Sequence, residues 1–304
     1  MPAHTRESGL EERSKSCADS PPTPARIGIF STLTSEGSRK LVQRVLHACR
    51  SGEIPGVEPS FIFVEREEGE FPTTDASVEA IRQTYGIPIH RASAIRFERD
   101  RRKAARESGD EAALWSWREA YYQSYAETLP STDLDLLLGS MWIWGGRQCK
   151  ERKGVNLHPS LPTGPLGKMW YDVVWDLVAM DAHHSGVMLH RVTDEVDEGP
   201  IVSYCRYALR GPSLDPLWAR LPDDPAEREA LIERERALKR ETEHPLFKAI
   251  RATGYARELP LMLETVRAVA EGRLRLEGGG VVDAARRPIE GGLDLSEDVA
   301  GSLA

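Results

Sequence analysis

The chain has 304 residues and a mass of 33.9 kDa, enough for one large domain or two smaller ones. Its 40 basic and 48 acidic residues give a formal net charge of -8, which argues against a broad basic surface for nucleic acid or anionic membranes. No apolar run approaches the roughly 20 residues of a membrane-spanning helix, and the N-terminus lacks the apolar core of a secretory signal. We therefore expect a cytoplasmic protein with no nucleic-acid and no membrane partner.

The cysteines give no sign of a metal site. All four lie far apart in the sequence, without the spacing of a metal-binding motif: Cys17, Cys49, Cys149 and Cys205. We expect them to be reduced, structural thiols of a cytosolic protein.

The first half of the chain alternates strands and helices. Residues 1–24 are rich in Ser, Pro and charge, which predicts a disordered leader. Apolar runs that suit buried strands and segments with helical spacing then follow one another in order. The predicted elements are a strand at 26–30, a helix at 39–52, a strand at 60–67, a helix opened by Asp75 and closed by Gly86, and a short strand at 87–90.

The second half begins with a long polar helical stretch at about 96–128, followed by strands within 133–144 and at 154–158. Residues 185–209 read as two alternating strands around an acidic turn, an antiparallel pair at the sheet edge. Charged helices at 223–253 and 258–272 and a glycine-rich hairpin at 273–289 follow. This pattern predicts a Rossmann-like α/β fold, with a mostly parallel twisted sheet, helices on both faces and antiparallel edge strands near the C-terminal part. We expect one domain at 25–290 and a flexible tail at 291–304.

A candidate site lies in the stretch GVNLHPSLP, residues 154–162. Asn156 and His158 are two apart, so on a strand their side chains point the same way, and Pro159 stops the strand from continuing. Asp197 follows 39 residues after His158, just before Gly-Pro and another strand. Taken singly, each residue has an ordinary structural explanation, as a turn former, a satisfied histidine or a solvated turn carboxylate. Their order as a set indicates a functional site.

Together, NLHPSLP and HRVTDEVDEGPI resemble the folate-dependent formyltransferases, most closely the glycinamide ribonucleotide formyltransferases. The stretch DLLLGSMWIW is similar to the strand and loop that contact folate in that family, and the resemblance runs from about Arg26 to about Ile289. It implies a formyltransferase domain at 25–290, 10-formyltetrahydrofolate as co-substrate, no metal, and a small-molecule amine as acceptor, in a monomer or homodimer.

The resemblance also implies roles for the three polar residues. Formyl transfer to an amine passes through a tetrahedral intermediate with a negative oxygen. Asn156 and protonated His158 can each donate a hydrogen bond to that oxygen, and one such donor is typically worth a factor of about 10² to 10³ in rate. Asp197 is expected across the site, where its carboxylate favours the charged imidazolium and helps to move a proton. His190, where the family also has a histidine, is expected to be mainly structural.

The folate-contacting loop is expected to supply the donor pocket. Its predicted cofactor-binding residues are consecutive in the sequence: Leu138, Gly139, Ser140, Met141, Trp142 and Ile143.

The acceptor half departs from the family. Where the close relatives have a compact Ser-Gly-x-Gly-Ser-Asn loop for the substrate phosphate, this chain has the longer STLTSEGSRK. Gly37, Ser38 and Arg39 could still bind a phosphate at a helix N-terminus. Glu36 opposes this hypothesis, and in the alternative the loop only caps its helix.

Several functions stay open. Glycinamide ribonucleotide, a purine precursor, is the favoured acceptor, and the alternatives are another amine such as an amino sugar, or a non-catalytic folate-binding relative. The intact Asn156, His158 and Asp197 set opposes the last of these. An enzyme that formylates transfer RNA would carry a basic C-terminal domain, whereas this C-terminal region is acidic. A formyltetrahydrofolate hydrolase usually has an N-terminal regulatory domain, which the short leader cannot form.

Overall fold

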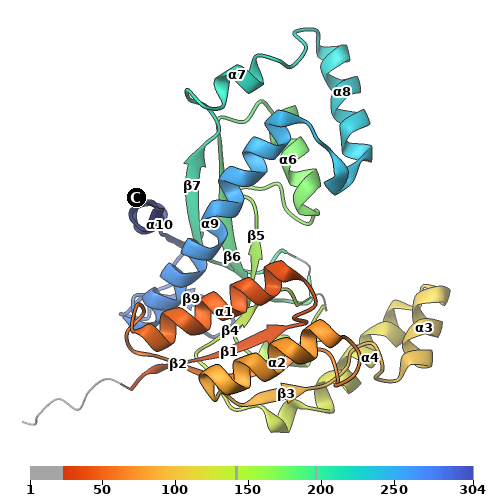
Figure 1. Ribbon diagram of the computed structural model, residues 1–304, viewed down its shortest axis with the longest axis vertical. Coiled ribbons are helices and arrows are strands. Elements are labelled where there is room, and N and C mark those ends of the chain that lie inside the picture. Colours follow the sequence, from red (N-terminus) through yellow and green to blue (C-terminus); the bar gives the residue numbers. More distant parts are fainter. Residues whose placement is uncertain (1–22, 141–142, 196, 304) are drawn as a thin grey trace, which may run out of the picture.

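The computed structural model describes residues 23–140, 143–195 and 197–303, and Figure 1 shows their arrangement. The strands are β1 (Ala25–Ser31), β2 (Val57–Val64), β3 (Ile89–Arg91), β4 (Leu134–Leu137), β5 (Gly154–His158), β6 (His184–Arg191), β7 (Ile201–Ala208), β8 (Arg275–Glu277), β9 (Gly280–Val282) and β10 (Leu293–Asp294). The α-helices are α1 (Glu36–Ser51), α2 (Pro72–Tyr85), α3 (Arg99–Ser108), α4 (Glu111–Gln123), α5 (Gly146–Glu151), α6 (Trp170–Ala179), α7 (Asp215–Trp218), α8 (Pro225–Ala237), α9 (Pro245–Ala270) and α10 (Ser296–Leu303). None of these helices is both long and apolar enough to span a bilayer, within the residues that the structure describes.

The main sheet has eight strands in the order β10-β7-β6-β5-β4-β1-β2-β3. Strands β1 to β5 are mutually parallel, whereas β6 is antiparallel to both β5 and β7. The predicted fold class is therefore confirmed, including the antiparallel pair after the parallel region. The predicted terminal hairpin also forms, as β8 and β9, with Gly278 and Gly279 in left-handed conformations that its turn requires.

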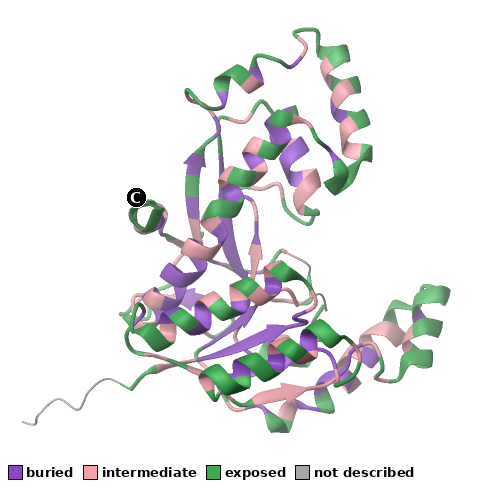
Figure 2. Cartoon of the chain, in the orientation of Figure 1, coloured by how far each residue is buried: buried purple, intermediate pink, exposed green. Residues whose placement is uncertain are grey.

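Helices cover both faces of the sheet, and the burial colours of Figure 2 follow the strands between them. On one face, β-strand side chains such as Ile27 and Ile29 pack with apolar residues of α1, α2 and α9. On the other face, Phe30, Phe61 and Phe63 join an aromatic cluster with α4. Both clusters exclude water from the sheet, which leaves its strand ends as the places where polar side chains can gather.

A third cluster forms an upper lobe, which lies at the top of Figure 1. It combines α6, α7, α8 and the first part of α9 with the ends of β6 and β7. Trp175 of α6 packs against Phe247 of α9 with ring centroids 5.4 Å apart, and Trp218 of α7 is buried nearby. Apolar residues within 173–178 of α6, which follow β5 in the chain, thus form part of the core of this lobe.

Two C-terminal segments differ from expectation. The helix expected to begin at 258 is part of α9, which continues through Pro260 because Leu261 and Met262 beside it are fully buried and offset the lost hydrogen bond. The segment expected as a flexible tail, 291–304, forms β10 and α10 up to Leu303. Leu295 and Val299 anchor it in the third cluster. The expected leader falls almost wholly outside the described residues.

Candidate active site

The site lies where β5 ends. Strand pairing places Asn156 opposite His190 of β6, and His158 opposite Met188. Residues that face each other across two strands share one face of the sheet, and so do residues two apart on a strand. Asn156, His158 and His190 therefore project from the same face, at the edge where β4 and β5 deliver their following loops.

Asp197 returns to this face from the loop between β6 and β7. Its Oδ2 lies 3.4 Å from Nδ1 of His158, and its Oδ1 lies 3.3 Å from Nε2 of His190. The carboxylate thus bridges two imidazoles, and all three side chains are largely buried, with exposed fractions of 15%, 4% and 3%. Hydrogen bonding from His158 and then from His190 holds the pKa of Asp197 well below its usual range, against the opposing effect of burial.

The loop geometry explains why the sequence reads DEVDEGP. Asp197 has a left-handed backbone with φ 60°, a conformation that Asp tolerates better than most residues. Gly199 then passes so close to Arg191 that a Cβ atom would lie 1.9 Å from its carbonyl oxygen. Only glycine fits this approach, so Gly199 allows the loop to fold back and present Asp197 to the two histidines.

The second nitrogen of His158 also has a partner. Nε2 lies 3.0 Å from the backbone carbonyl oxygen of Pro165, in the loop after β5. A carbonyl oxygen can only accept, so Nε2 carries a proton, while Nδ1 faces the ionised Asp197. Each ring nitrogen of His158 therefore lies beside an acceptor oxygen, the Pro165 carbonyl at Nε2 and the Asp197 carboxylate at Nδ1.

His190 contributes more than the sequence suggested. Its Nδ1 lies 3.0 Å from the carbonyl oxygen of Arg191, and its Nε2 meets Asp197. It therefore helps to fix the carboxylate that faces His158. The pairing of β5 with β6 places His190 opposite Asn156, and therefore on the face of the sheet that carries the site. Three further histidines lie away from the site: His183 and His184 are exposed, and the ring of His244 has its centroid 5.5 Å from that of Trp175.

The predicted donor loop begins in tight contact with the loop after β1. Leu138 is buried, and its carbonyl accepts a hydrogen bond of 2.6 Å from Ser31 Oγ. The Gly139 carbonyl accepts one of 3.0 Å from Thr32 Oγ1. A Cβ atom on Gly139 would lie 2.5 Å from Cβ of Ser38, and its φ is 74°. Glycine is required at this position because a larger residue would clash with Ser38 and would be strained at a positive φ.

The rest of the donor loop is divided between core and solvent. Ser140 Oγ donates to Oε1 of the buried Glu65 at 2.5 Å. Ile143 is 41% exposed, whereas Trp144 is buried with its ring centroid 5.0 Å from that of Phe30. Met141 and Trp142, also predicted to contact folate, lie outside the described residues. The exposed Ile143 beside the buried Trp144 leaves an apolar side chain free to meet a ligand.

The predicted phosphate loop uses its polar groups internally. Ser35 caps α1, since its Oγ accepts from Ser38 N at 3.1 Å, and Ser38 Oγ returns a bond to the Ser35 carbonyl at 2.9 Å. The Arg39 guanidinium donates to the Thr34 carbonyl at 2.8 Å. Gly37 has open space around it. This arrangement matches the alternative in which the loop caps its helix.

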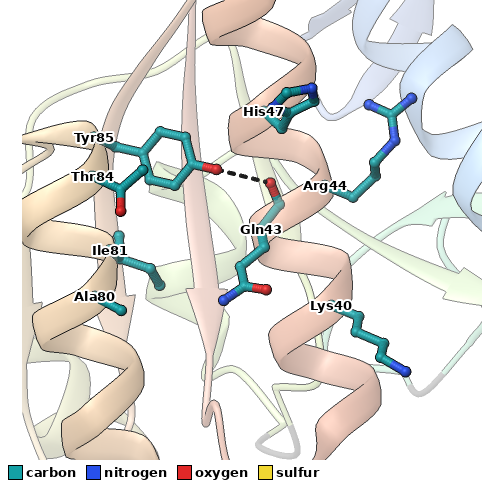
Figure 3. Close-up of a pocket in the computed structure, with 8 residues that line it drawn as sticks. All are labelled: Lys40, Gln43, Arg44, His47, Ala80, Ile81, Thr84 and Tyr85. Atoms are coloured by element: carbon teal, nitrogen blue, oxygen red, sulfur yellow. Dashed lines mark hydrogen bonds between the residues drawn. The ribbon is translucent and has the colours of Figure 1, made fainter.

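A groove between α1 and α2 is also basic, as Figure 3 shows. It encloses about 370 Å³ and is lined by Lys40, Gln43, Arg44, His47, Ala80, Ile81, Thr84 and Tyr85. Lys40 pairs with Glu36 at 2.6 Å, and Arg44 pairs with Glu53 at 2.5 Å. The groove contains no residue of the Asn156, His158 and Asp197 set. Across the described ranges, no cluster of three or more His, Cys, Asp or Glu side chains is placed to hold a metal ion.

No protein-family model matches the chain. Among solved structures, similar folds include phosphoribosylglycinamide formyltransferase of Coxiella burnetii, with a TM-score of 0.52, 16% identity, and coverage of 89% of this chain and 99% of that one. Glycinamide ribonucleotide transformylase 1 of Symbiobacterium toebii has a TM-score of 0.50 and 22% identity over 86% of this chain and 94% of that one. A formyltetrahydrofolate deformylase of Pseudomonas putida has a TM-score of 0.50 and 16% identity over 87% of this chain and 72% of that one.

Curated sequences add a local similarity. The dTDP-4-amino-4,6-dideoxyglucose formyltransferases of Mycobacterium bovis and Mycobacterium tuberculosis are 33% identical to this chain over 107 residues. That segment spans 35% of this chain and only 38% of the length of these relatives. The fold of the glycinamide ribonucleotide formyltransferases and this local similarity together confirm the resemblance of the chain to the folate-dependent formyltransferase family.

Proposed function

We propose that this protein transfers a formyl group from 10-formyltetrahydrofolate to a primary amine. The observation that carries the proposal is the buried His158–Asp197 contact, at the end of β5, on the face that also bears Asn156. Such a pair supplies a charged hydrogen-bond donor held in place by a carboxylate, which is what stabilisation of a tetrahedral oxyanion needs.

The chemistry follows from the three groups. When the acceptor amine attacks the formyl carbon, negative charge develops on the formyl oxygen. The imidazolium of His158 and the amide of Asn156 donate to that oxygen. Asp197 would hold His158 in its charged form and take a proton from the attacking amine, and that proton would pass to N10 of the folate as the bond between N10 and the formyl carbon breaks. Positioned proton transfer contributes typically about 10² to 10⁴ in rate.

The donor would bind along the loop that starts at Leu138. The exposed side chain of Ile143 is available to a pterin ring. The tight fit of Gly139 against Ser38 would fix the start of this loop before the ligand arrives, which lowers the cost of ordering Leu138 and Gly139 on binding.

Two acceptors remain, and two observations favour an amino sugar over glycinamide ribonucleotide. The first is the 33% local identity with enzymes named for a dTDP-linked amino sugar. The second is the use of Ser38 and Arg39 within their own loop, because a phosphate there would have to displace existing hydrogen bonds. We therefore propose a nucleotide-linked amino sugar as the preferred acceptor and retain glycinamide ribonucleotide as the second candidate.

The test is an acceptor screen with 10-formyltetrahydrofolate, followed by the absorbance of the folate product. We expect activity with at least one amine, and a loss of at least about 10² in turnover for His158→Ala. His183→Ala, which changes an exposed histidine, is the matched control and should retain activity. Wild-type turnover in the His158 variant would disprove the mechanism. Absence of folate binding to the intact protein would disprove the donor.

A further inference from the structure

The hydrogen-bond donor that the proposed reaction needs, Nε2 of His158, already has a partner within the protein. The side chain of His158 is only 4% exposed, and its Nε2 donates to the Pro165 carbonyl at 3.0 Å. Nδ1 is directed to Asp197, so Nε2 is the nitrogen that the proposed reaction needs for the formyl oxygen. A substrate oxygen cannot reach this nitrogen while the carbonyl of Pro165 stays in place.

We infer that the loop at 161–168 holds the site in a self-blocked state, in which the Pro165 carbonyl takes the position of the formyl oxygen. This inference rests on the proposed function. The two oxygens are chemically alike, since each belongs to the carbonyl of an amide. Binding of the donor therefore exchanges one carbonyl acceptor for another and conserves the charged hydrogen bond of His158.

The loop is anchored at its two ends. At the first end, the Leu161 side chain packs against Gly186 of β6, where a Cβ atom would lie 2.5 Å from Leu161 Cδ2. The amide of Gly164 also donates to the Leu161 carbonyl at 2.9 Å. At the other end, Lys168 Nζ binds Oδ2 of Asp176 on α6 at 2.6 Å.

Between these anchors the loop has little to hold it. Leu166 and Gly167 are exposed, and Leu166 leaves 37% of its surface in solvent. A cavity of about 560 Å³ lies beside the loop, and its lining includes Leu166, Leu177 and Met180. Withdrawal of the loop from His158 would break few apolar contacts and has space to occupy, so the blocked state is poised to open.

The anchor at Lys168 makes the inference testable. Lys168→Ala removes the ion pair with Asp176, whereas Lys168→Arg keeps a cation there and is the matched control. Partly exposed ion pairs are worth up to about 1 kcal/mol, which converts to a shift of up to about fivefold toward the open loop. We expect kcat/KM for 10-formyltetrahydrofolate to rise by about two- to fivefold in Lys168→Ala and to stay unchanged in Lys168→Arg.

A second measurement does not depend on activity. In the uncomplexed protein with ¹⁵N-labelled histidine, the Nε2 proton of His158 should exchange with water far more slowly than ring protons of the exposed His183 and His184. In Lys168→Ala its exchange should accelerate by the same two- to fivefold factor. Exchange as fast as that of His183, or an unchanged rate in Lys168→Ala, would overturn the self-blocked state. Absence of formyl transfer by the wild type, with a protected His158 proton, would instead count against the proposed function alone.

Discussion

Replacement of Asp197 by Asn removes the negative charge of the side chain and keeps its size, so it tests what the charge alone contributes. Asn tolerates the left-handed backbone that Asp197 adopts at φ 60°, so Asp197→Asn removes the charge without the strain that Ala would add. Hydrogen bonds to charged groups contribute about 1.5 to 3 kcal/mol each, and the best are about 2.8 Å long. The two contacts of Asp197 measure 3.4 and 3.3 Å. We therefore assign about 1 kcal/mol to each and expect a total loss of about 2 kcal/mol at pH 7.

The pH dependence of this loss has a definite sign. The pKa of Asp197 is lowered in the folded protein, so its carboxylate stabilises the fold at every pH above the unfolded value of about 3.9. As the pH falls below that value, the unfolded state takes up a proton first and the advantage over Asn shrinks. The free energies of unfolding of wild type and Asp197→Asn should therefore differ by a constant amount above about pH 5 and converge below about pH 4.

Urea unfolding followed by tryptophan fluorescence, from pH 7 to pH 3.5, measures both quantities. Asp181→Asn is the matched control, because Asp181 also has a left-handed backbone, at φ 51°, but its side chain is 58% exposed in a surface pair with Arg210. It should change stability by at most about 0.5 kcal/mol. Turnover of Asp197→Asn should fall by at least about 10². A loss below about 0.5 kcal/mol that does not vary with pH, together with normal turnover, would refute the bridging role.

Three further outcomes are expected. Gly139→Ala should weaken binding of a non-reactive folate analogue by about tenfold in calorimetry, while Gly37→Ala, at an open position, leaves it unchanged; equal affinities would contradict the donor loop. Arg39→Ala should leave the Michaelis constant of an amino-sugar acceptor within about twofold, and a several-fold rise for glycinamide ribonucleotide would revive the phosphate hypothesis. Asp135→Ala should cost about 3 to 5 kcal/mol in urea unfolding, because it leaves the buried Arg152 unpaired; a loss under about 1 kcal/mol would mean that water reaches the guanidinium.

The sequence predicted the parts of the site that depend on local pattern. The strand at 154–158 has the predicted bounds, and the alternation along β5 correctly places Asn156 and His158 on one face. The His158–Asp197 contact was expected only from the family resemblance, because nothing local brings residues 39 positions apart together.

Other features depend on the path of the chain in three dimensions. The sequence was expected to form separate helices at 223–253 and 258–272, whereas α9 runs unbroken from Pro245 to Ala270 and keeps Pro260 inside it, because Leu261 and Met262 are buried in the core. Arg39 reads as a free cation in the sequence, and its bond to the Thr34 carbonyl follows from a loop conformation that no periodicity reveals. The contact between His158 and the Pro165 carbonyl also depends on a loop conformation that the sequence pattern does not reveal.

The length of α9 has a consequence for unfolding. Over 26 residues it extends for about 39 Å, from the upper lobe to the flank of the sheet beside β9 and α1. Leu246, Phe247 and Ile250 belong to the cluster of the upper lobe, whereas Met262 and Val266 belong to the cluster beneath the sheet. If α9 unfolds, both hydrophobic clusters lose the residues that it contributes to them. The two lobes should therefore melt in a single cooperative transition, and a fragment that ends before α9 should not fold.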